Sequence, residues 1–440
     1  MDYLTPYETE YLVQSLQEIT VREYAGKQWF AQHENLYKLN LQSHRNAKAR
    51  EDEYVLDAMV TFDKIKGLIY NLIVSETWKS KVLPLCTSEV LALSTIRSYT
   101  LIYHEAILCN FLSILLYHRT ACVESGDYLI DLIDWCYRKL VKLAGDDDPD
   151  KQESKLDRPE EFAAQVRELD FAMGIESLSI IQFITDHLQE MTLAVIQQLV
   201  EQCDIFCVLV PLMEKKPWVK HGKTGKMVFE NQIWSKVKDY LKVPKAEAQI
   251  WLTVYNLFMN PDVRGKYELS SYRKQNLLRL RKFINETLVD QIPVLGSLLR
   301  SLEELSLIGD NLPSKISAFA IHQLPELQDR ISYKQDWNEI AVYQKANFLI
   351  ENPEEQKKAA ELMMSGIDDF LEEPICSECG EPATNRCSKC HHEWYCSRKC
   401  QVAAWKRHKQ VCALLAEGKE QTTKEEPKTQ GPKIVDITGD

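Results

Sequence analysis

Residues 376–412 read CSECGEPATNRCSKCHHEWYCSRKCQVAAWKRHKQVC and hold seven of the thirteen cysteines in this 440-residue chain. Their spacing is Cys-x2-Cys-x7-Cys-x2-Cys-x5-Cys-x3-Cys-x7-His-x3-Cys. Eight thiol and imidazole groups complete two tetrahedral zinc sites and leave no coordination position for water. The spacing therefore predicts two structural zinc ions, Zn2+, held by Cys376, Cys379, Cys387, Cys390, Cys396, Cys400, His408 and Cys412.

These eight residues form four pairs along the chain. Two CxxC turns supply one pair each. The other two pairs, Cys396 with Cys400 and His408 with Cys412, lie in or directly before a helix predicted over residues 397–412, and the members of each pair are four residues apart and therefore expected on one helical face. Spacing alone allows the pairs to be joined sequentially or interleaved. His391 and His392 follow Cys390 directly, and we expect both at the surface because the eight positions are already filled.

The metal is expected to be structural. A module of 37 residues is too short to build a sufficient apolar core. Bound zinc contributes on the order of 10 kcal/mol to the folding of such a module. Hydrolytic zinc needs an open coordination position and a glutamate base, and neither is evident in this stretch.

The composition, 45% apolar and 27% charged, is that of a soluble globular protein. The start of the chain is amphipathic and acidic, and no run of about 18 apolar residues occurs, so we expect neither secretion nor membrane insertion. Six further cysteines are scattered through apolar runs, which favours a reducing compartment. We expect them to be small buried hydrophobic residues: Cys86, Cys109, Cys122, Cys136, Cys203 and Cys207.

The formal charge of −12 is unevenly distributed. Residues 376–412 contain seven Lys and Arg against three acids, a net of +4, so the remainder carries about −16. An acidic body disfavours nucleic acid as a partner. The local basic excess is explained by the zinc centres, whose thiolates give them a net negative charge. Arg398, Lys399, Lys406, Arg407 and Lys409 are thus expected to offset these centres and not to bind nucleic acid.

Helical periodicity extends through most of residues 1–370 and predicts an all-α body. Residues 107–116, for example, place apolar side chains in one broad stripe. Strand-like alternation with Asn-Gly or Asp-Gly turns is absent, and the segment His221–Lys226 is expected to be a loop. We expect an armadillo- or HEAT-like array of paired helices, with an irregular helical bundle as the alternative, because no fixed repeat is found.

Three other segments complete the predicted organisation. Gly145–Glu161 is charged and contains two prolines, which indicates an acidic solvated loop near residues 145–161. A last helix is predicted over residues 353–373, before the zinc module of residues 376–412. Residues 417–440 lack an apolar cluster and are predicted to be a disordered polar tail.

The zinc module resembles the MYND finger, including its Tyr-Cys-x3-Cys-Gln-x3-Trp-x2-His-x3-Cys ending from Tyr395 to Cys412. The resemblance implies interleaved sites, with Cys376, Cys379, Cys396 and Cys400 on one zinc and Cys387, Cys390, His408 and Cys412 on the other. It also implies a protein-interaction module whose groove for proline-containing peptides is lined by Ser388, Gln401 and Trp405. The alternative for Trp405 is that it packs in the small core.

An enzyme of the SET-domain methyltransferase class, some of which carry MYND fingers, is not supported. That fold is rich in β-structure and needs a glycine-rich cofactor loop and an Asn-His-x-Cys stretch. Neither is present here. The sequence therefore favours a protein that is not an enzyme.

The whole chain also resembles the family of zinc finger MYND domain-containing protein ten, which are axonemal dynein arm pre-assembly factors. The similar stretches include QHENLYKLN (Gln32–Asn40), ETWKSKV (Glu76–Val82), YHEAILCNFL (Tyr103–Leu112), YRKL (Tyr137–Leu140) and IWLTVYNL (Ile250–Leu257). We expect these body stretches to be helix faces.

This second resemblance implies a non-catalytic adaptor or co-chaperone for cytoplasmic pre-assembly of inner and outer dynein arms, required for motile cilia. The implied partners are a leucine-rich-repeat dynein assembly factor and co-chaperones of the ninety-kilodalton heat-shock protein, with dynein chains as clients. The implied location is the cytoplasm, with the centrosome, centriolar satellites and the apical region of ciliated cells as candidate places of enrichment. The alternative function is a nuclear co-repressor adaptor that recruits proline-motif proteins.

Overall fold

The computed structural model describes residues 4–145, 157–222, 225–237, 239–308 and 323–351, four single residues between 353 and 361, and most of residues 376–412. Its contacts divide the chain into two units, residues 1–352 and 353–440, and each is described by itself. Most of the loop predicted near residues 145–161, much of the helix predicted over 353–373 and the whole tail of 417–440 lie outside the described residues.

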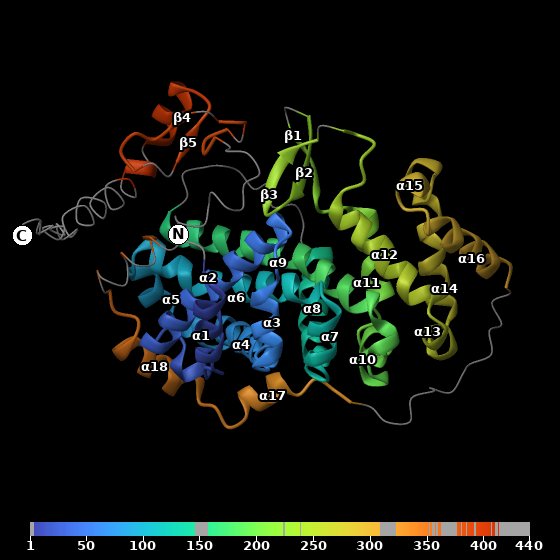
Figure 1. The fold of residues 1–440 in the computed structure, drawn as a ribbon, viewed down its shortest axis with the longest axis horizontal. Helices are drawn as coiled ribbons and strands as arrows, with labels where there is room; N and C mark the ends of the chain where they lie inside the picture. Colours follow the sequence, from blue (N-terminus) through green and yellow to red (C-terminus); the bar gives the residue numbers. More distant parts are fainter. Residues whose placement is uncertain are drawn as a thin grey trace, which may run out of the picture. The chain divides into compact units, whose positions relative to one another are not determined.

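The first unit is built almost entirely of helices, so the predicted all-α class is confirmed (Figure 1). The longer helices are α2 (Lys27–Ala49), α4 (Ile65–Thr77), α6 (Thr95–Leu116), α8 (Tyr128–Gly145), α9 (Arg158–Asp186), α11 (Ile205–Lys215), α12 (Lys245–Met259) and α16 (Leu295–Leu307). The shorter ones are α1 (Pro6–Ser15), α3 (Tyr54–Thr61), α5 (Leu83–Ala92), α7 (Arg119–Ser125), α10 (Leu193–Gln197), α13 (Pro261–Lys266), α14 (Ser271–Leu278), α15 (Glu286–Gln291), α17 (Leu327–Ser332) and α18 (Trp337–Asn347). Two π-helical turns, η2 (Trp78–Val82) and η4 (Gln198–Gln202), and three short 3-10 turns, η1 (Val21–Glu23), η3 (Leu188–Glu190) and η5 (Arg279–Phe283), join them.

Local sequence signals start several of these helices. Thr5 and Asp157 each form a capping box with a glutamate three residues later, at the starts of α1 and α9. Ser94 and Asn260 accept hydrogen bonds from the first-turn amides of α6 and α13. These side chains satisfy amides that the helix leaves without partners.

Helix α6 lies at the centre of the first unit. It packs against α2, α4 and α9, and α9 packs in turn against α8 and α12. By length and composition α6 could cross a membrane, but 72% of its most apolar window is buried inside the structure. That burial is typical of the core helix of a soluble protein.

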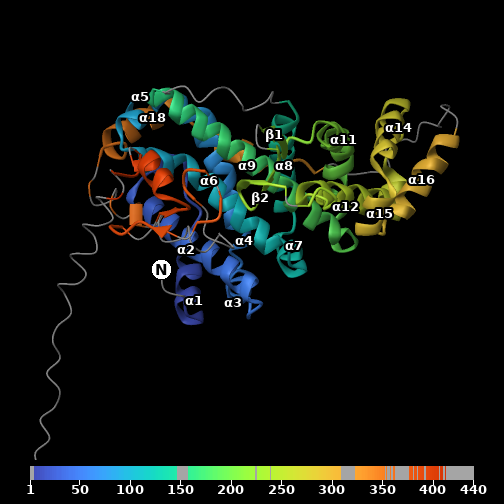
Figure 2. The same cartoon turned by 90° about the horizontal axis from the view of Figure 1, so that it is seen from above.

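The last helices of the first unit pack against elements near its start. Helix α17 packs on α4, and α18 packs on η1, η2 and α5. The indole N–H of Trp78 donates to Gln344 Oε1 at 2.8 Å, and Gln344 Nε2 donates to the carbonyl of Val21 at 2.7 Å. In a solenoid each repeat contacts only its neighbours. These returning contacts favour the irregular helical arrangement over the expected array (Figures 1 and 2).

A small antiparallel sheet replaces the loop predicted around His221–Lys226, so that prediction was wrong. Strands β1 (Val219–Gly222), β2 (Gly225–Glu230) and β3 (Ile233–Lys236) form a meander in the order β1-β2-β3. Glu230 pairs with Ile233, so the second turn is Asn231-Gln232, and both residues have positive φ, 50° and 65°. This geometry is that of a two-residue hairpin turn. The signal was missed because Asn-Gln is not the usual Asn-Gly dipeptide.

The scattered cysteines are mostly buried, as expected. Five of the six are buried and Cys207 is partly exposed. Burial raises the pKa of Cys86 to about 11 and that of Cys122 and Cys203 to about 12. These thiols are therefore protonated and unreactive near neutral pH.

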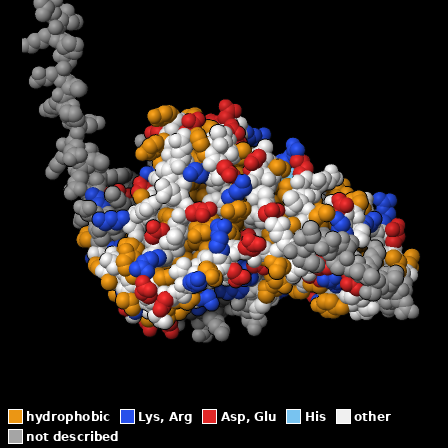
Figure 3. All heavy atoms as spheres, turned by 90° about the horizontal axis from the view of Figure 1, so that it is seen from below, with side chains coloured by type: hydrophobic (Ala, Val, Ile, Leu, Met, Phe, Trp, Pro, Cys, Tyr) orange, Lys and Arg blue, Asp and Glu red, His pale blue; other side chains and the backbone are white. Residues whose placement is uncertain are grey.

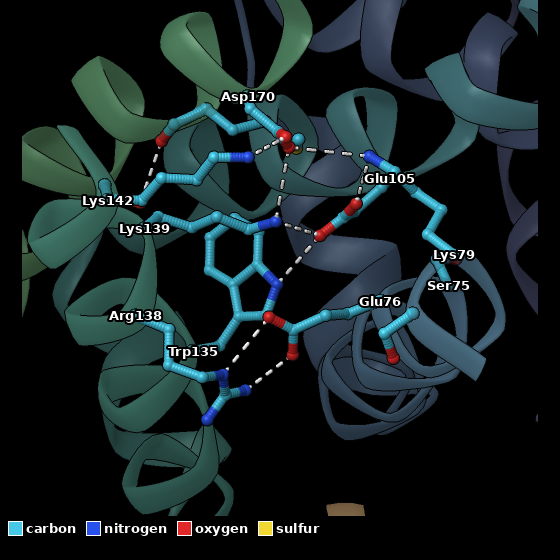
Figure 4. A network of polar contacts seen from close by, with 12 residues as sticks. Ser75, Glu76, Lys79, Glu105, Trp135, Arg138, Lys139, Lys142 and Asp170 are labelled. Atoms are coloured by element: carbon cyan, nitrogen blue, oxygen red, sulfur yellow. Dashed lines mark hydrogen bonds and ion pairs between the residues drawn. The ribbon is translucent and has the colours of Figure 1, made fainter. Parts of the chain in front are cut away.

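A buried carboxylate joins four helical segments (Figure 4). Glu105 of α6 has a side chain that is 0% exposed, and its two oxygens each lie 2.7 Å from a lysine, Lys79 of η2 and Lys139 of α8. The indole N–H of Trp135 donates to Glu105 Oε1 at 3.0 Å. Asp170 of α9 lies 3.6 Å from Lys79 Nζ and 3.7 Å from Lys139 Nζ. We call these five residues the Glu105 cluster.

Two more ion pairs extend the Glu105 cluster toward the surface. Lys142 Nζ lies 2.5 Å from Asp170 Oδ2, and Arg138 makes two contacts of 3.1 and 2.6 Å with Glu76. Glu76, Lys79, Glu105, Arg138 and Lys139 all come from body stretches that carried the family resemblance. Those stretches are helix faces, as expected, but their charged side chains also meet at one place.

The substitution Glu105→Gln should lower the free energy of unfolding by about 3 kcal/mol at neutral pH, because it leaves two buried ammonium groups with too little negative charge. Burial opposes ionisation of Glu105, but Lys139 and Lys79 hold its pKa at about 2. A carboxyl pKa below the ordinary value of about 4.3 stabilises the fold above that value, and the stabilisation is lost as pH falls toward 2. The difference in unfolding free energy between wild type and variant, measured by chemical denaturation, should therefore shrink as the pH falls from about 4.3 toward 2.

Glu34→Gln is the matched control. Glu34 pairs with Lys38 on the surface of α2 at 2.5 Å, and its side chain is 41% exposed. Removing this pair should cost no more than about 0.5 kcal/mol. Equal losses for the two variants would contradict the role assigned to Glu105.

Candidate metal centre

The finger folds around two short strands and one helix. Strands β4 (Asn385–Arg386) and β5 (Trp394–Tyr395) pair in antiparallel fashion, and residues 398–405, 407–409 and 412 are helical, as predicted. The amide of Cys387 donates to the carbonyl of Glu393 at 2.8 Å, and that of Cys376 donates to Glu381 at 2.7 Å. The amide of Ser377 donates to the carbonyl of Trp394 in β5 at 3.0 Å, which holds the first CxxC turn beside the strand pair.

The first cluster consists of Cys376, Cys379, Cys396 and Cys400, whose sulfur atoms all lie within 4.8 Å of one another. Cys379 Sγ lies 3.4 Å from Cys396 Sγ and 3.7 Å from Cys400 Sγ, and the last two sulfurs are 3.5 Å apart. Cys376 is buried, Cys396 and Cys400 are partly exposed, and Cys379 is exposed.

The second cluster consists of Cys387, Cys390, His408 and Cys412, and all four residues are buried. His408 Nε2 lies 3.4 Å from Cys387 Sγ and 3.5 Å from Cys390 Sγ. Cys387 Sγ lies 3.8 Å from Cys412 Sγ. The imidazole therefore directs Nε2 toward the thiols.

These distances fit zinc. Zn–S bonds of about 2.3 Å and Zn–N bonds of about 2.05 Å place tetrahedral ligand atoms about 3.8 Å apart for two sulfurs and about 3.6 Å for sulfur and nitrogen. The distances within both clusters lie close to those values. The interleaved assignment is confirmed, and the donor set fits two zinc ions.

Interleaving makes the clusters part of the finger's core. The buried residues of the finger are Cys376, Ala383, Cys387, Cys390, Tyr395, Ala404 and Cys412, with Trp394, Cys396 and Cys400 packed against them. Most of this set is metal-binding cysteine, and only two of the buried members are alanines. Metal coordination, and not apolar burial, must therefore supply most of the folding free energy of the finger.

The pKa values of two thiols in the first cluster are shifted in opposite directions. Burial opposes ionisation of Cys376, but the backbone amides of Cys396, Cys379 and Glu378 lower its pKa to about 6. Hydrogen bonds shared with Cys379 and Cys400 raise the pKa of Cys396 to about 12. Neighbouring thiols thus retain protons that metal binding would release.

Glu393 is a candidate positioning residue for a zinc ligand that the spacing of the cysteines did not reveal. Its Oε1 lies 3.0 Å from the buried Nδ1 of His408, and its Oε2 accepts a 2.6 Å hydrogen bond from the hydroxyl of Tyr395. A carboxylate on the distal nitrogen fixes the tautomer and orientation of a zinc-binding histidine. The sequence signal was weak, because Glu393 lies 15 residues before His408 and β5 has to bring them together.

The three predicted groove residues are all near the surface of the finger. Ser388 is exposed on the second CxxC turn, Gln401 is partly buried, and Trp405 is 40% exposed. The ring of Trp405 lies 5.8 Å from that of His408, at the margin of the second cluster. Trp405 does not belong to the buried core set, although it contacts a ligand. His391 and His392 lie outside the described residues.

Cys396→Ala should leave the first cluster with three ligands and unfold the finger, because the metal supplies most of its stability. Metal analysis of the purified full-length chain should then fall below two zinc ions per molecule. Cys207→Ala is the control, since it removes a body thiol outside both clusters and should retain both metals. Full zinc content in the Cys396 variant would contradict the assignment.

Glu393→Ala should keep the fold but weaken zinc at the second cluster by about 10- to 100-fold, the usual cost of losing the partner of a ligating histidine. Competition with a chromogenic chelator measures this change. Glu378→Ala is a suitable control, because Glu378 pairs with Arg407 at 2.9 Å and contacts no metal ligand through that bond. Equal zinc affinity in both variants would exclude the proposed orientation of His408.

Comparison with known proteins supports the assignment of residues 376–412 as a MYND finger. The MYND finger family matches residues 376–412. The chain is 27% identical to the zinc finger MYND domain-containing protein 10 homolog of Drosophila melanogaster over 449 aligned positions, which cover 94% of this chain and 99% of the relative. No solved structure matches the chain. The expected resemblance is thus confirmed: the chain contains a MYND finger at residues 376–412, and along nearly its whole length it is similar to that Drosophila protein.

Proposed function

We propose that this protein is a non-catalytic adaptor for cytoplasmic pre-assembly of inner and outer axonemal dynein arms, and that motile cilia require it. The observation that carries the proposal is the similarity to the zinc finger MYND domain-containing protein 10 homolog over 94% of the chain. That extent covers the helical body as well as the finger. The dynein-arm role is the one implied by the resemblance of the sequence.

The MYND finger supports an interaction role. MYND fingers are protein-interaction modules, and this one has an exposed indole next to its second metal cluster. Trp405 offers an apolar platform for proline, and Gln401, one turn earlier, offers hydrogen bonds to an extended peptide backbone. Ser388 is exposed and completes the proposed groove.

The closed metal clusters support a non-catalytic role. Each cluster supplies four protein ligands, which leaves no coordination position at which zinc could activate water. The buried ionisable groups of the Glu105 cluster are paired with one another across helices. Both features stabilise the fold and need no substrate to explain them.

The proposed partners divide between the two units. A leucine-rich-repeat dynein assembly factor would bind through the C-terminal part. Co-chaperones of the ninety-kilodalton heat-shock protein, with dynein chains as clients, would use the helical body. We propose a cytoplasmic location, with enrichment near the centrosome and its satellites and in the apical region of ciliated cells, and no binding of nucleic acid or insertion into membranes.

The alternative is a nuclear co-repressor adaptor that recruits proline-motif proteins through the same finger. The densest candidate for a nuclear-import cluster is Lys406-Arg407-His408-Lys409. His408 of this run is buried in the second metal cluster, which makes the run a poor signal for an import receptor. Nuclear accumulation of the full-length protein would nevertheless favour the alternative.

Ciliated cells that lack this protein should form axonemes without inner and outer dynein arms, as seen by electron microscopy. The full-length chain should restore the arms, and Cys396→Ala should not. Trp405→Ala should retain two zinc ions but restore fewer arms, because it removes the proposed peptide platform. Normal arms in the deficient cells would contradict the proposed function. Loss of zinc from the Trp405 variant would show that this residue packs the finger and does not line a groove.

A further inference from the structure

The two metal clusters of the finger differ in their exposure to solvent. All four residues of the second cluster are buried, at 2% exposure or less. In the first cluster only Cys376 is buried, whereas Cys379 is exposed and Cys396 and Cys400 are partly exposed. A dissolved reagent can therefore approach the first cluster at Cys379, but the second cluster is shielded from it.

Side chains of the finger itself cover the second cluster. The ring of Tyr395 lies 6.3 Å from that of His408, and the ring of Trp405 lies 5.8 Å from it. Glu393 Oε1 lies 3.0 Å from His408 Nδ1. The imidazole in turn lies against two thiols of the cluster. These contacts explain why the second cluster is closed to solvent.

The turn that carries Cys379 is held by polar contacts. Arg407 Nη2 donates to the carbonyl of Ser377 at 3.2 Å and to Glu378 Oε2 at 2.9 Å. Both contacts join the first CxxC turn to the helix of the finger. Polar groups at the surface do not exclude water as an apolar cover does, so Cys379 stays exposed although its turn is fixed.

The sulfur atoms of the first cluster are close enough to react with one another. Cys379 Sγ lies 3.4 Å from Cys396 Sγ and 3.7 Å from Cys400 Sγ. A cysteine binds metal as the thiolate, which is also its nucleophilic form. Oxidation of cysteine follows thiolate character and exposure, and it is reversible where a second thiol lies beside the first. Cys379 combines these three properties.

Among the residues that the structure describes, the helical body offers no thiol with the same properties. Five of its six cysteines are buried, and burial raises the pKa of the partly exposed Cys207 to about 12. A reactive thiolate needs electropositive surroundings. On the face shown in Figure 3, however, Lys and Arg are interspersed with Asp and Glu. We therefore expect the thiols of the body to stay reduced while the first cluster reacts.

We propose that the first cluster is a peroxide-responsive modification site, at which oxidation of Cys379 releases zinc and unfolds the finger. Docking through the finger would then be lost under oxidising conditions and regained after reduction. The proposal rests on the metal assignment and on the unequal exposure of the two clusters. It is independent of the dynein-arm role proposed above.

Hydrogen peroxide is the oxidant, and the reaction has two steps. First, the Cys379 thiolate attacks one peroxide oxygen, the O–O bond breaks, and a sulfenic acid and a hydroxide ion form. Second, the thiolate of Cys396, the nearer sulfur, attacks the sulfenic sulfur, so that an S–S bond forms and a second hydroxide leaves. Two electrons pass from sulfur to oxygen, and each hydroxide takes up a proton to become water. Zn2+ is released because two of its four ligands are lost.

The first test follows the full-length wild-type protein during mild treatment with hydrogen peroxide. A chromogenic chelator records zinc release, and N-ethylmaleimide quenches samples early, because loss of the first zinc unfolds the finger and uncovers the second cluster. Mass spectrometry of these samples should find disulfides within the first cluster at least about tenfold more often than within the second. Dithiothreitol followed by zinc should restore both metal ions.

The second test uses Cys379→His, which keeps a side chain that binds zinc but removes the exposed thiolate. Its rate of zinc release by peroxide should fall by about tenfold, because the remaining thiols of the cluster are less accessible. Cys207→Ala is the control. It removes a partly exposed thiol of the body, and it should change the rate by less than about twofold.

Three results would overturn the proposal. These are disulfides that form in the second cluster as early as in the first, an undiminished rate in zinc-loaded Cys379→His, and failure of the reduced wild-type protein to bind zinc again. If the histidine variant does not retain two zinc ions before oxidation, the positions of the disulfides in the wild-type protein decide the question.

Discussion

The carboxylate of Glu105 is the buried charge on which the helical body depends. It is fully enclosed, and it is stable there only because Lys79 and Lys139 approach from two other segments and Trp135 donates to it. Asp170 of α9 then balances the second of the two lysine charges. An uncompensated buried charge costs several kcal/mol. Helices α6, α8 and α9 and the π-turn η2 must therefore adopt one mutual arrangement, and a register shift in any of them would separate the charges.

The two units are stabilised by different physical means. The body buries large apolar and aromatic side chains, among them Trp29, Trp78, Trp135 and Trp251, around a central helix. The finger has almost no apolar core, and its buried residues are mainly the ligands themselves. Loss of metal should therefore unfold the finger and leave the body intact. The protein therefore has one scaffold that is stable by itself and one module whose folding depends on zinc.

The proposed groove of the finger consists of side chains near its surface on a supported frame. Trp405 and Gln401 lie on the helix that also carries Cys400 and His408, so metal binding positions the proposed groove. The adaptor role proposed above needs such a surface, because an adaptor holds its partners in a fixed relation.

The sequence by itself determined the helical class of the body, through its apolar period, and the identity and number of the eight zinc ligands, because thiol and imidazole at that spacing have few other uses. Interleaving of the clusters could be implied only by resemblance, since spacing allows two ways of joining four pairs. Tertiary structure alone decided that Glu105 meets Lys79 and Lys139, that Glu393 lies beside His408, and that residues 219–222, 225–230 and 233–236 form three paired strands. Long-range pairing of charges leaves no periodic trace in a sequence, and Asn-Gln is not one of the dipeptides, such as Asn-Gly, that by themselves predict a two-residue hairpin turn.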